Sequence, residues 1–163
     1  MSRTAFSMQR PAPAFPLAIA TLWACVALFF VRVIGQIEVL LLQPAWLPSM
    51  PAWYSGLLPY PLLLPIQIAL LMLMCVLALK AAQRPRGGGE DRRRWAKPLR
   101  ALALLYFAIM AVRLILTVRL YGADFYLHGA IPIAFHWVLA LYLLVWTRLG
   151  LAHSGSSELP LFV

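Results

Sequence analysis

The sequence predicts an all-α fold: a four-helix transmembrane bundle with both termini cytoplasmic. Three observations predict it: the composition, four long apolar segments, and a one-sided distribution of cations. Of the 163 residues, 63% are hydrophobic and 12% charged, against about 45–50% and about 25% in soluble domains. A chain of this length cannot bury so much apolar surface in a soluble core. A soluble enzyme, a secreted disulfide scaffold and a disordered tail are therefore excluded.

Each apolar segment reaches the roughly 20 residues that a helix needs to cross a bilayer. Helices are expected because the backbone must satisfy its own hydrogen bonds in lipid. The first segment is longer than a bilayer requires and has no small-residue cleavage site, so we interpret it as a tilted span and not a signal peptide. A single integral membrane domain, 1–163, is predicted with spans at about 16–42, 57–79, 98–120 and 128–147.

The orientation follows from where Lys and Arg lie. The amino tail carries Arg3 and Arg10, the connection 80–100 carries eight cations, and Arg148 follows the last span. The connections on the other side, 43–56 and 121–127, carry none. By the positive-inside rule, both termini and the 80–100 connection are expected in the cytoplasm, with the protein in a bacterial-type inner membrane.

The two longer connections differ in character. The 80–100 connection contains RPRGGGEDRRR, and we interpret it as a solvated basic loop that fixes topology. Binding of anionic lipid or of a partner's acidic face is the lesser alternative. The 43–56 connection is rich in proline and carries Trp46, Trp53 and Tyr54. It is expected to form a stiff amphipathic cap in the outer interface, where aromatic rings favour the headgroup level.

Polar side chains inside the spans are the candidates for function, because such residues are costly in lipid. On the first helix they recur at helical spacing along one narrow stripe, and Tyr106, Met110, Arg113 and Thr117 form a similar stripe on the third. The predicted ligand-binding layer, in the outer half of the membrane, consists of Arg32, Gln36, Gln67, Arg113 and His136. The predicted outer rim consists of Glu38, Arg119, Asp124 and His128.

This layer allows two interpretations. In the first it is a structural network in which Glu38, Asp124 or backbone carbonyls neutralise the arginines. In the second it is a cavity for an anion or carbonyl, since the cations Arg32, Arg113 and Arg119 outnumber those two outer acids. An unpaired buried cation is expensive, and the arginine fork suits phosphate and carboxylate groups.

We therefore expect a non-enzymatic binding or accessory subunit that holds a lipid, a quinone-like head group or a partner helix. The expected partners are membrane lipid and, as alternatives, other membrane subunits or a second copy. A membrane enzyme or small transporter acting on an anionic amphiphile is the alternative function. A lesser alternative is haem or chlorophyll-type pigment ligated by His136. No metal or catalytic motif is found, and no nucleic-acid motif accompanies the net charge of +9.

Overall fold

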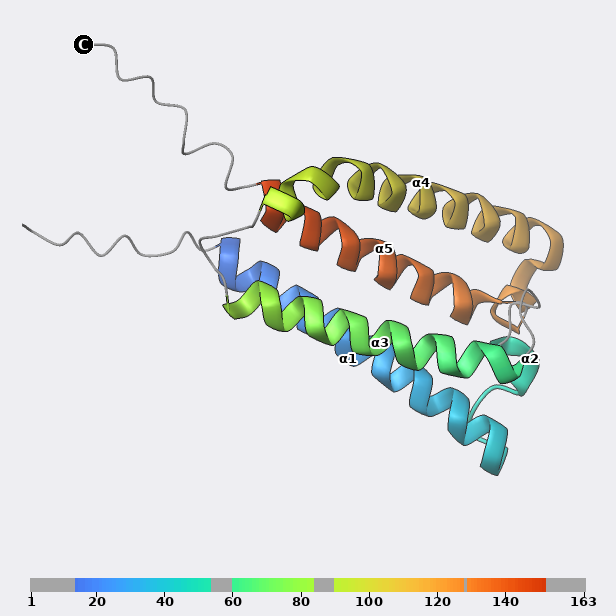
Figure 1. Cartoon of the computed structure of the whole chain (residues 1–163). Helices are drawn as coiled ribbons and strands as arrows, with labels where there is room; N and C mark the ends of the chain where they lie inside the picture. The colour runs from blue at the N-terminus through green and yellow to red at the C-terminus, as the bar shows by residue number, and fades with distance from the viewer. Residues whose placement is uncertain (1–13, 54–59, 84–89, 128, 152–163) are drawn as a thin grey trace, which may run out of the picture.

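The computed structural model describes residues 14–53, 60–83, 90–127 and 129–151, and within these ranges it consists of helices and short connecting turns, without strands. The predicted all-α four-helix transmembrane bundle is confirmed. Four of the helices are long and apolar enough to cross a membrane. They are α1 (Ala14–Leu42), α3 (Tyr60–Gln83), α4 (Glu90–Tyr121) and α5 (Ala130–Leu151), joined in part by the short α2 (Met50–Trp53) and the 3₁₀-helix η1 (Gly122–Leu127). Helix α1 begins and α5 ends at the same end of the bundle (Figure 1).

Helix α4 is longer than the apolar segment from which it was predicted. It begins at Glu90 and runs through Pro98, whereas hydrophobicity alone placed the start of the span at Pro98. The sequence of these first turns, EDRRRWAK, is rich in charged residues, so hydropathy does not count them as part of the span. Hydropathy thus locates the part of a helix suited to lipid, while charged turns continue the same helix beyond it.

The long helices pack in the order α3–α1–α5–α4. Helix α5 packs extensively on α4 and on α1, and α1 packs on α3, whereas α3 and α5 touch only slightly. No backbone contact joins α3 to α4. Figure 1 shows α5 between α4 and the α1–α3 pair. The bundle is therefore open along one side, between α3 and α4.

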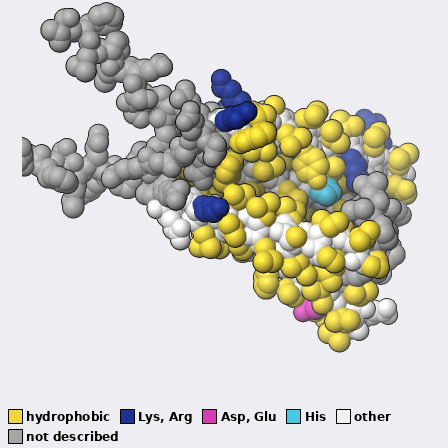
Figure 2. All heavy atoms as spheres, viewed as in Figure 1, with side chains coloured by type: hydrophobic (Ala, Val, Ile, Leu, Met, Phe, Trp, Pro, Cys, Tyr) yellow, Lys and Arg dark blue, Asp and Glu magenta, His cyan; other side chains and the backbone are white. Residues whose placement is uncertain are grey.

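The main core lies where α1, α3 and α5 meet. Phe29 of α1, Met74 of α3 and Tyr142 of α5 are among its buried members. Ala78 and Ala81 let α3 approach its neighbours closely, as small residues do between membrane helices. Large hydrophobic side chains remain exposed on the outside of the four long helices, and they dominate the face seen in Figure 2. This distribution suits a surface surrounded by lipid.

The proline- and aromatic-rich connection packs on the helix ends through Trp53. The Trp53 indole N–H donates a hydrogen bond to the Pro48 carbonyl at 3.0 Å. Its ring lies so close to Gly35 of α1 that a Cβ at this glycine would be 2.8 Å from the ring. Val39 and Ile131 complete the contact. Helix α2 therefore caps α1 and α5 beside the predicted polar layer.

Candidate functional site

Arg32 and Gln36 lie one turn apart on α1 and are both buried, with 7% and 0% of their surfaces exposed. The Arg32 Nη1 group donates a hydrogen bond of 3.4 Å to Gln36 Oε1. The Arg32 guanidinium lies over the ring of Phe135 on α5, with Cζ 5.3 Å from the ring centroid. A cation–π contact therefore directs this arginine toward α5.

The hydrogen bonding of this pair is incomplete. Arg32 Nε and Gln36 Nε2 are buried and have no hydrogen-bond partner. Among the described residues, no carboxylate lies within 4.0 Å of the Arg32 guanidinium. Of the neutralising groups that the structural-network interpretation allows, neither Glu38 nor Asp124 therefore pairs with Arg32. A buried cation with free donors and no counter-charge is an unusual arrangement in a folded protein.

His136 of α5 meets Tyr106 of α4 beside this pair. The Tyr106 hydroxyl lies 2.8 Å from His136 Nδ1, within hydrogen-bond distance. The two rings are packed edge to face, with centroids 5.4 Å apart. One residue along each helix, Phe107 and Trp137 stack at 5.3 Å. These two neighbouring ring pairs fix the register of α4 against α5 and hold the imidazole in place.

Arg113 lies on the same helix as Tyr106, about two turns further along. It is half-buried, and one of its terminal nitrogens would lie 3.8 Å from a Cβ placed on Gly129. Both Arg113 and Arg32 lie within electrostatic range of the His136 ring, and Arg113 is also within range of Tyr106. Three helices therefore bring two cations, an imidazole and a phenol together. We call Arg32, Gln36, Tyr106, Arg113 and His136 the polar cluster.

Gln67, the fifth residue of the predicted layer, lies apart from these contacts on α3. It is 5% exposed, its Oε1 accepts no hydrogen bond, and no hydrogen bond joins it to the polar cluster. Of the predicted rim, Glu38 is half-buried, whereas Arg119 and Asp124 are exposed. The fourth rim residue, His128, lies outside the described residues. The structure thus links four of the five predicted ligand-binding residues by contact or proximity.

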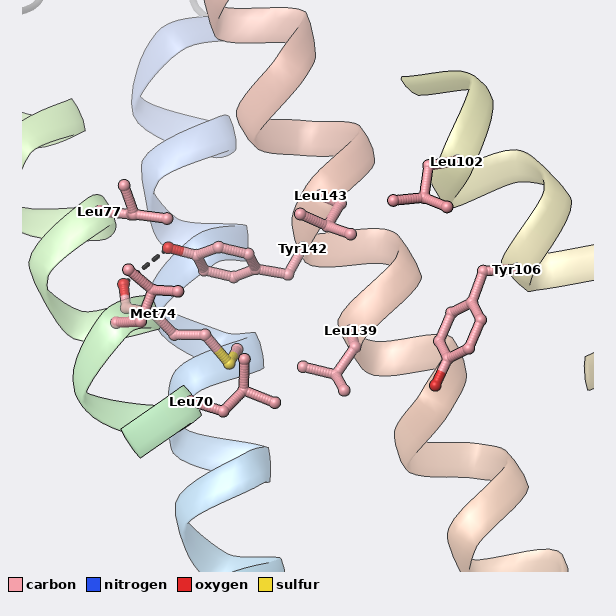
Figure 3. Close-up of a pocket in the computed structure, with 9 residues that line it drawn as sticks. Leu70, Met74, Leu77, Leu102, Tyr106, Leu139, Tyr142 and Leu143 are labelled. Atoms are coloured by element: carbon pink, nitrogen blue, oxygen red, sulfur yellow. Dashed lines mark hydrogen bonds between the residues drawn. The ribbon is translucent and has the colours of Figure 1, made fainter. Parts of the chain in front are cut away.

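An apolar cavity of about 330 Å³ opens next to the polar cluster (Figure 3). It exists because α3 and α4 do not meet, so that side chains of α3, α4 and α5 surround an unfilled space. Tyr142 lines it from α5 and donates a hydrogen bond of 2.6 Å to the Met74 carbonyl of α3. Its lining consists of Leu70, Leu73, Met74, Leu77, Leu102, Tyr106, Leu139, Tyr142 and Leu143.

Tyr106 belongs to both the cavity lining and the polar cluster. The sequence contained a signal for it, because Tyr106 shares a helical stripe with Arg113. Spacing along α4 alone did not reveal that its hydroxyl meets an imidazole on α5. The cavity had no signal in the sequence, since it depends on which helices pack together.

The chemistry of this arrangement suits a polar group with negative charge or a carbonyl oxygen. Arginine and glutamine N–H groups donate hydrogen bonds, and the Tyr106–His136 pair can exchange a proton. Within the described part of the chain, no three His, Cys, Asp or Glu side chains come together. No family model matches the chain, and neither a curated protein nor a solved structure matches it.

Proposed function

We propose that this protein binds the head group of a membrane amphiphile in the polar cluster, as a non-enzymatic binding or accessory subunit. The head group carries a negative charge or a carbonyl oxygen. One observation carries the proposal: Arg32 is buried without a carboxylate partner among the residues that the structure describes, and neither its Nε nor the Gln36 Nε2 group donates a hydrogen bond to the protein. A ligand oxygen supplies both the missing acceptor and the missing charge.

The arginine side chain favours this assignment over a generic polar contact. Its planar fork binds carboxylate and phosphate oxygens with two parallel hydrogen bonds. The second cation, Arg113, approaches the same region from α4. A head group between these helices would therefore meet donors from two sides. A network that existed only to hold the helices together would be expected to satisfy its own buried groups.

The side of the membrane follows from the cation distribution. We infer a bacterial-type inner membrane with both termini in the cytoplasm, because the ends of α3, α4 and α5 remote from η1 carry Lys80, Arg94, Lys97, Arg100 and Arg148. In this orientation the polar cluster lies in the outer half of the membrane, and its ligand comes from the outer leaflet.

The Tyr106–His136 hydrogen bond favours a second candidate: a membrane enzyme that acts on the same anionic amphiphile. An imidazole held by a phenol and flanked by arginines resembles an acid–base pair beside an anion site. Both candidate functions involve the same ligand, and they differ in whether the protein changes that ligand chemically. An enzyme changes the amphiphile chemically, whereas a binding subunit returns it unchanged.

The experiment is native mass spectrometry of the protein purified in mild detergent from a bacterial membrane. We expect one class of anionic or carbonyl-bearing amphiphile to remain bound, and Arg113→Gln to release it while the fold persists. Arg113→Lys should release most of it, since an ammonium cannot reproduce the fork. Arg119→Gln, on an exposed position of the same helix, is the matched control and should retain the ligand.

Retention of the ligand by Arg113→Gln at the level of the control would reject the binding proposal. Incubation with the isolated amphiphile separates the two candidates, because conversion that depends on His136 supports the enzyme. An absorption spectrum of the same preparation tests the pigment alternative at this residue. A Soret or chlorophyll-type band removed by His136→Leu would replace the proposed head group with a macrocycle.

A further inference from the structure

The apolar cavity between α3, α4 and α5 lies directly beside the polar cluster, and Tyr106 belongs to both. We propose that this cavity holds the hydrocarbon chain of the bound amphiphile, and that the ligand is a single long chain with a compact carboxylate or phosphate head. This inference rests on the proposed function for the head group. It adds the chemical class of the rest of the ligand and the path by which it arrives.

The chemistry of the lining favours a hydrocarbon chain. Seven of the nine lining residues are leucine or methionine, and the other two are tyrosines. The Tyr142 hydroxyl is occupied by the Met74 carbonyl and the Tyr106 hydroxyl by His136. Water needs several polar partners to occupy a cavity, so a space with this lining does not hold it well. A chain of methylene groups fills the space without leaving polar groups unpaired.

The size of the cavity favours one chain over two. Its volume of about 330 Å³ lies at the lower end of the roughly 300–1,000 Å³ typical of small-molecule sites. Such a space accommodates a segment of one hydrocarbon chain, whereas a phospholipid would have to leave its second chain in the bilayer.

The direction of the cavity matches the orientation of a lipid in a leaflet. On α5, Leu139 and Leu143 lie about one to two turns beyond His136, away from η1. On α4, Leu102 lies about one turn beyond Tyr106 in the same direction. The cavity therefore runs from the polar cluster toward the middle of the bundle. A lipid in the leaflet near η1 is oriented in the same way, with its head group nearer η1 and its chain directed toward the middle of the bilayer.

The route into the cavity is sideways from the bilayer. Helices α3 and α4 make no backbone contact, so the space between them faces the surrounding lipid. Figure 3 shows Leu70, Met74 and Leu77 on one side of the cavity and Leu102 and Tyr106 on the other. Figure 2 shows a histidine side chain at the surface among apolar ones. A chain can therefore enter laterally while its head group reaches the polar cluster.

The test uses the full-length protein in detergent and a photoreactive hexadecanoate that carries a diazirine in the middle of its chain. Hexadecyl phosphate competes as the second anionic head, and the photoreactive hexadecanol analogue provides a chain without charge. We expect light to attach the hexadecanoate probe to peptides that contain the lining residues of α3, α4 and α5. Excess hexadecyl phosphate should suppress this labelling, and the alcohol should label these peptides weakly.

Variants separate the chain site from the head-group site. Leu143→Trp and Leu102→Trp place a bulky ring in the cavity and should abolish labelling of its lining. Leu141→Trp adds the same ring to the exposed face of α5 and is the matched control, which should label as the native protein does. The two cavity-filling variants are on different helices, so the test still stands if one of them fails to fold. Monodisperse elution in size-exclusion chromatography checks the folding of each variant.

The outcomes distinguish the two proposals. If Leu143→Trp and Leu102→Trp both label like Leu141→Trp, the chain lies elsewhere and the cavity inference is overturned. If the alcohol labels the cavity as strongly as the carboxylate, and Arg32→Met changes neither, the cavity holds a chain but the head-group proposal fails. Loss of labelling in both the filling variants and Arg32→Met, with the control intact, is the expected result.

Discussion

Replacing Arg32 by methionine should make the ligand-free protein more stable while it removes the bound amphiphile. Arg32 is buried with no carboxylate within 4.0 Å among the described residues. In a separated helix, a long arginine side chain can extend toward the membrane interface. In the folded bundle the Arg32 guanidinium is held over Phe135. The free-energy cost of burying its charge therefore destabilises the folded state and not the separated helix. Methionine has a similar reach and no charge.

The size of the effect follows from the contacts of Arg32. A charge inside the membrane costs about 2.5 kcal/mol or more on insertion-based scales. Against this, the substitution removes one hydrogen bond to Gln36, worth about 0.6 kcal/mol in a membrane protein, and one cation–π contact, worth about 1 kcal/mol. A sulfur–aromatic contact of methionine with Phe135 returns about 0.5 kcal/mol. The net expectation is stabilisation by about 1 kcal/mol.

The assay is reversible unfolding in mixed micelles, with the denaturing detergent titrated against delipidated protein. Arg119→Met is the matched control, because this exposed arginine has no buried contacts to lose and its stability should not change. A destabilisation by Arg32→Met of more than about 1 kcal/mol would refute the reasoning, since a buried charge that stabilises the fold must already have its partner. The structural-network interpretation would then hold for this arginine.

Three further predictions address other parts of the molecule. In a background whose other five tryptophans are replaced by phenylalanine, Gly35→Leu should displace Trp53, whose ring leaves no room for a Cβ, and the indole emission should shift to the red; unchanged emission would show that α2 does not pack there. Tyr106→Phe should reduce the amount of amphiphile retained on native mass spectrometry but lower the free energy of unfolding by only about 0.6 kcal/mol; full retention would exclude the hydroxyl from the site. In a background without native cysteines, a cysteine at Ser49 should react with impermeant maleimide in intact cells and one at Gln83 should not; the reverse pattern would invert the orientation.

The sequence predicted which helix carries each polar residue of the layer but did not determine the partners of these residues. Arg32 and Gln36 share one face of α1 because they are four residues apart, and the structure joins them by a hydrogen bond. Gln67 seemed equally suited by depth, yet it lies on α3, which packs on α1 and touches α5 only slightly. The depth of a residue along its helix is predictable from a rise of about 1.5 Å per residue. The neighbouring helix that each face of a helix contacts is not predictable in this way.

The sequence by itself determined that the chain forms four apolar helices, because lipid offers the backbone no other way to satisfy its hydrogen bonds. It also determined that cations lie within those helices. The tertiary structure decided that Arg32 has no carboxylate beside it within the described ranges, that Tyr106 meets His136, and that α3 and α4 leave a cavity between them. Hydrophobicity drives helices into a membrane but does not choose their neighbours, since lipid chains are as apolar as leucine. That choice belongs to the shapes and close contacts of side chains, which exist only once the helices have packed.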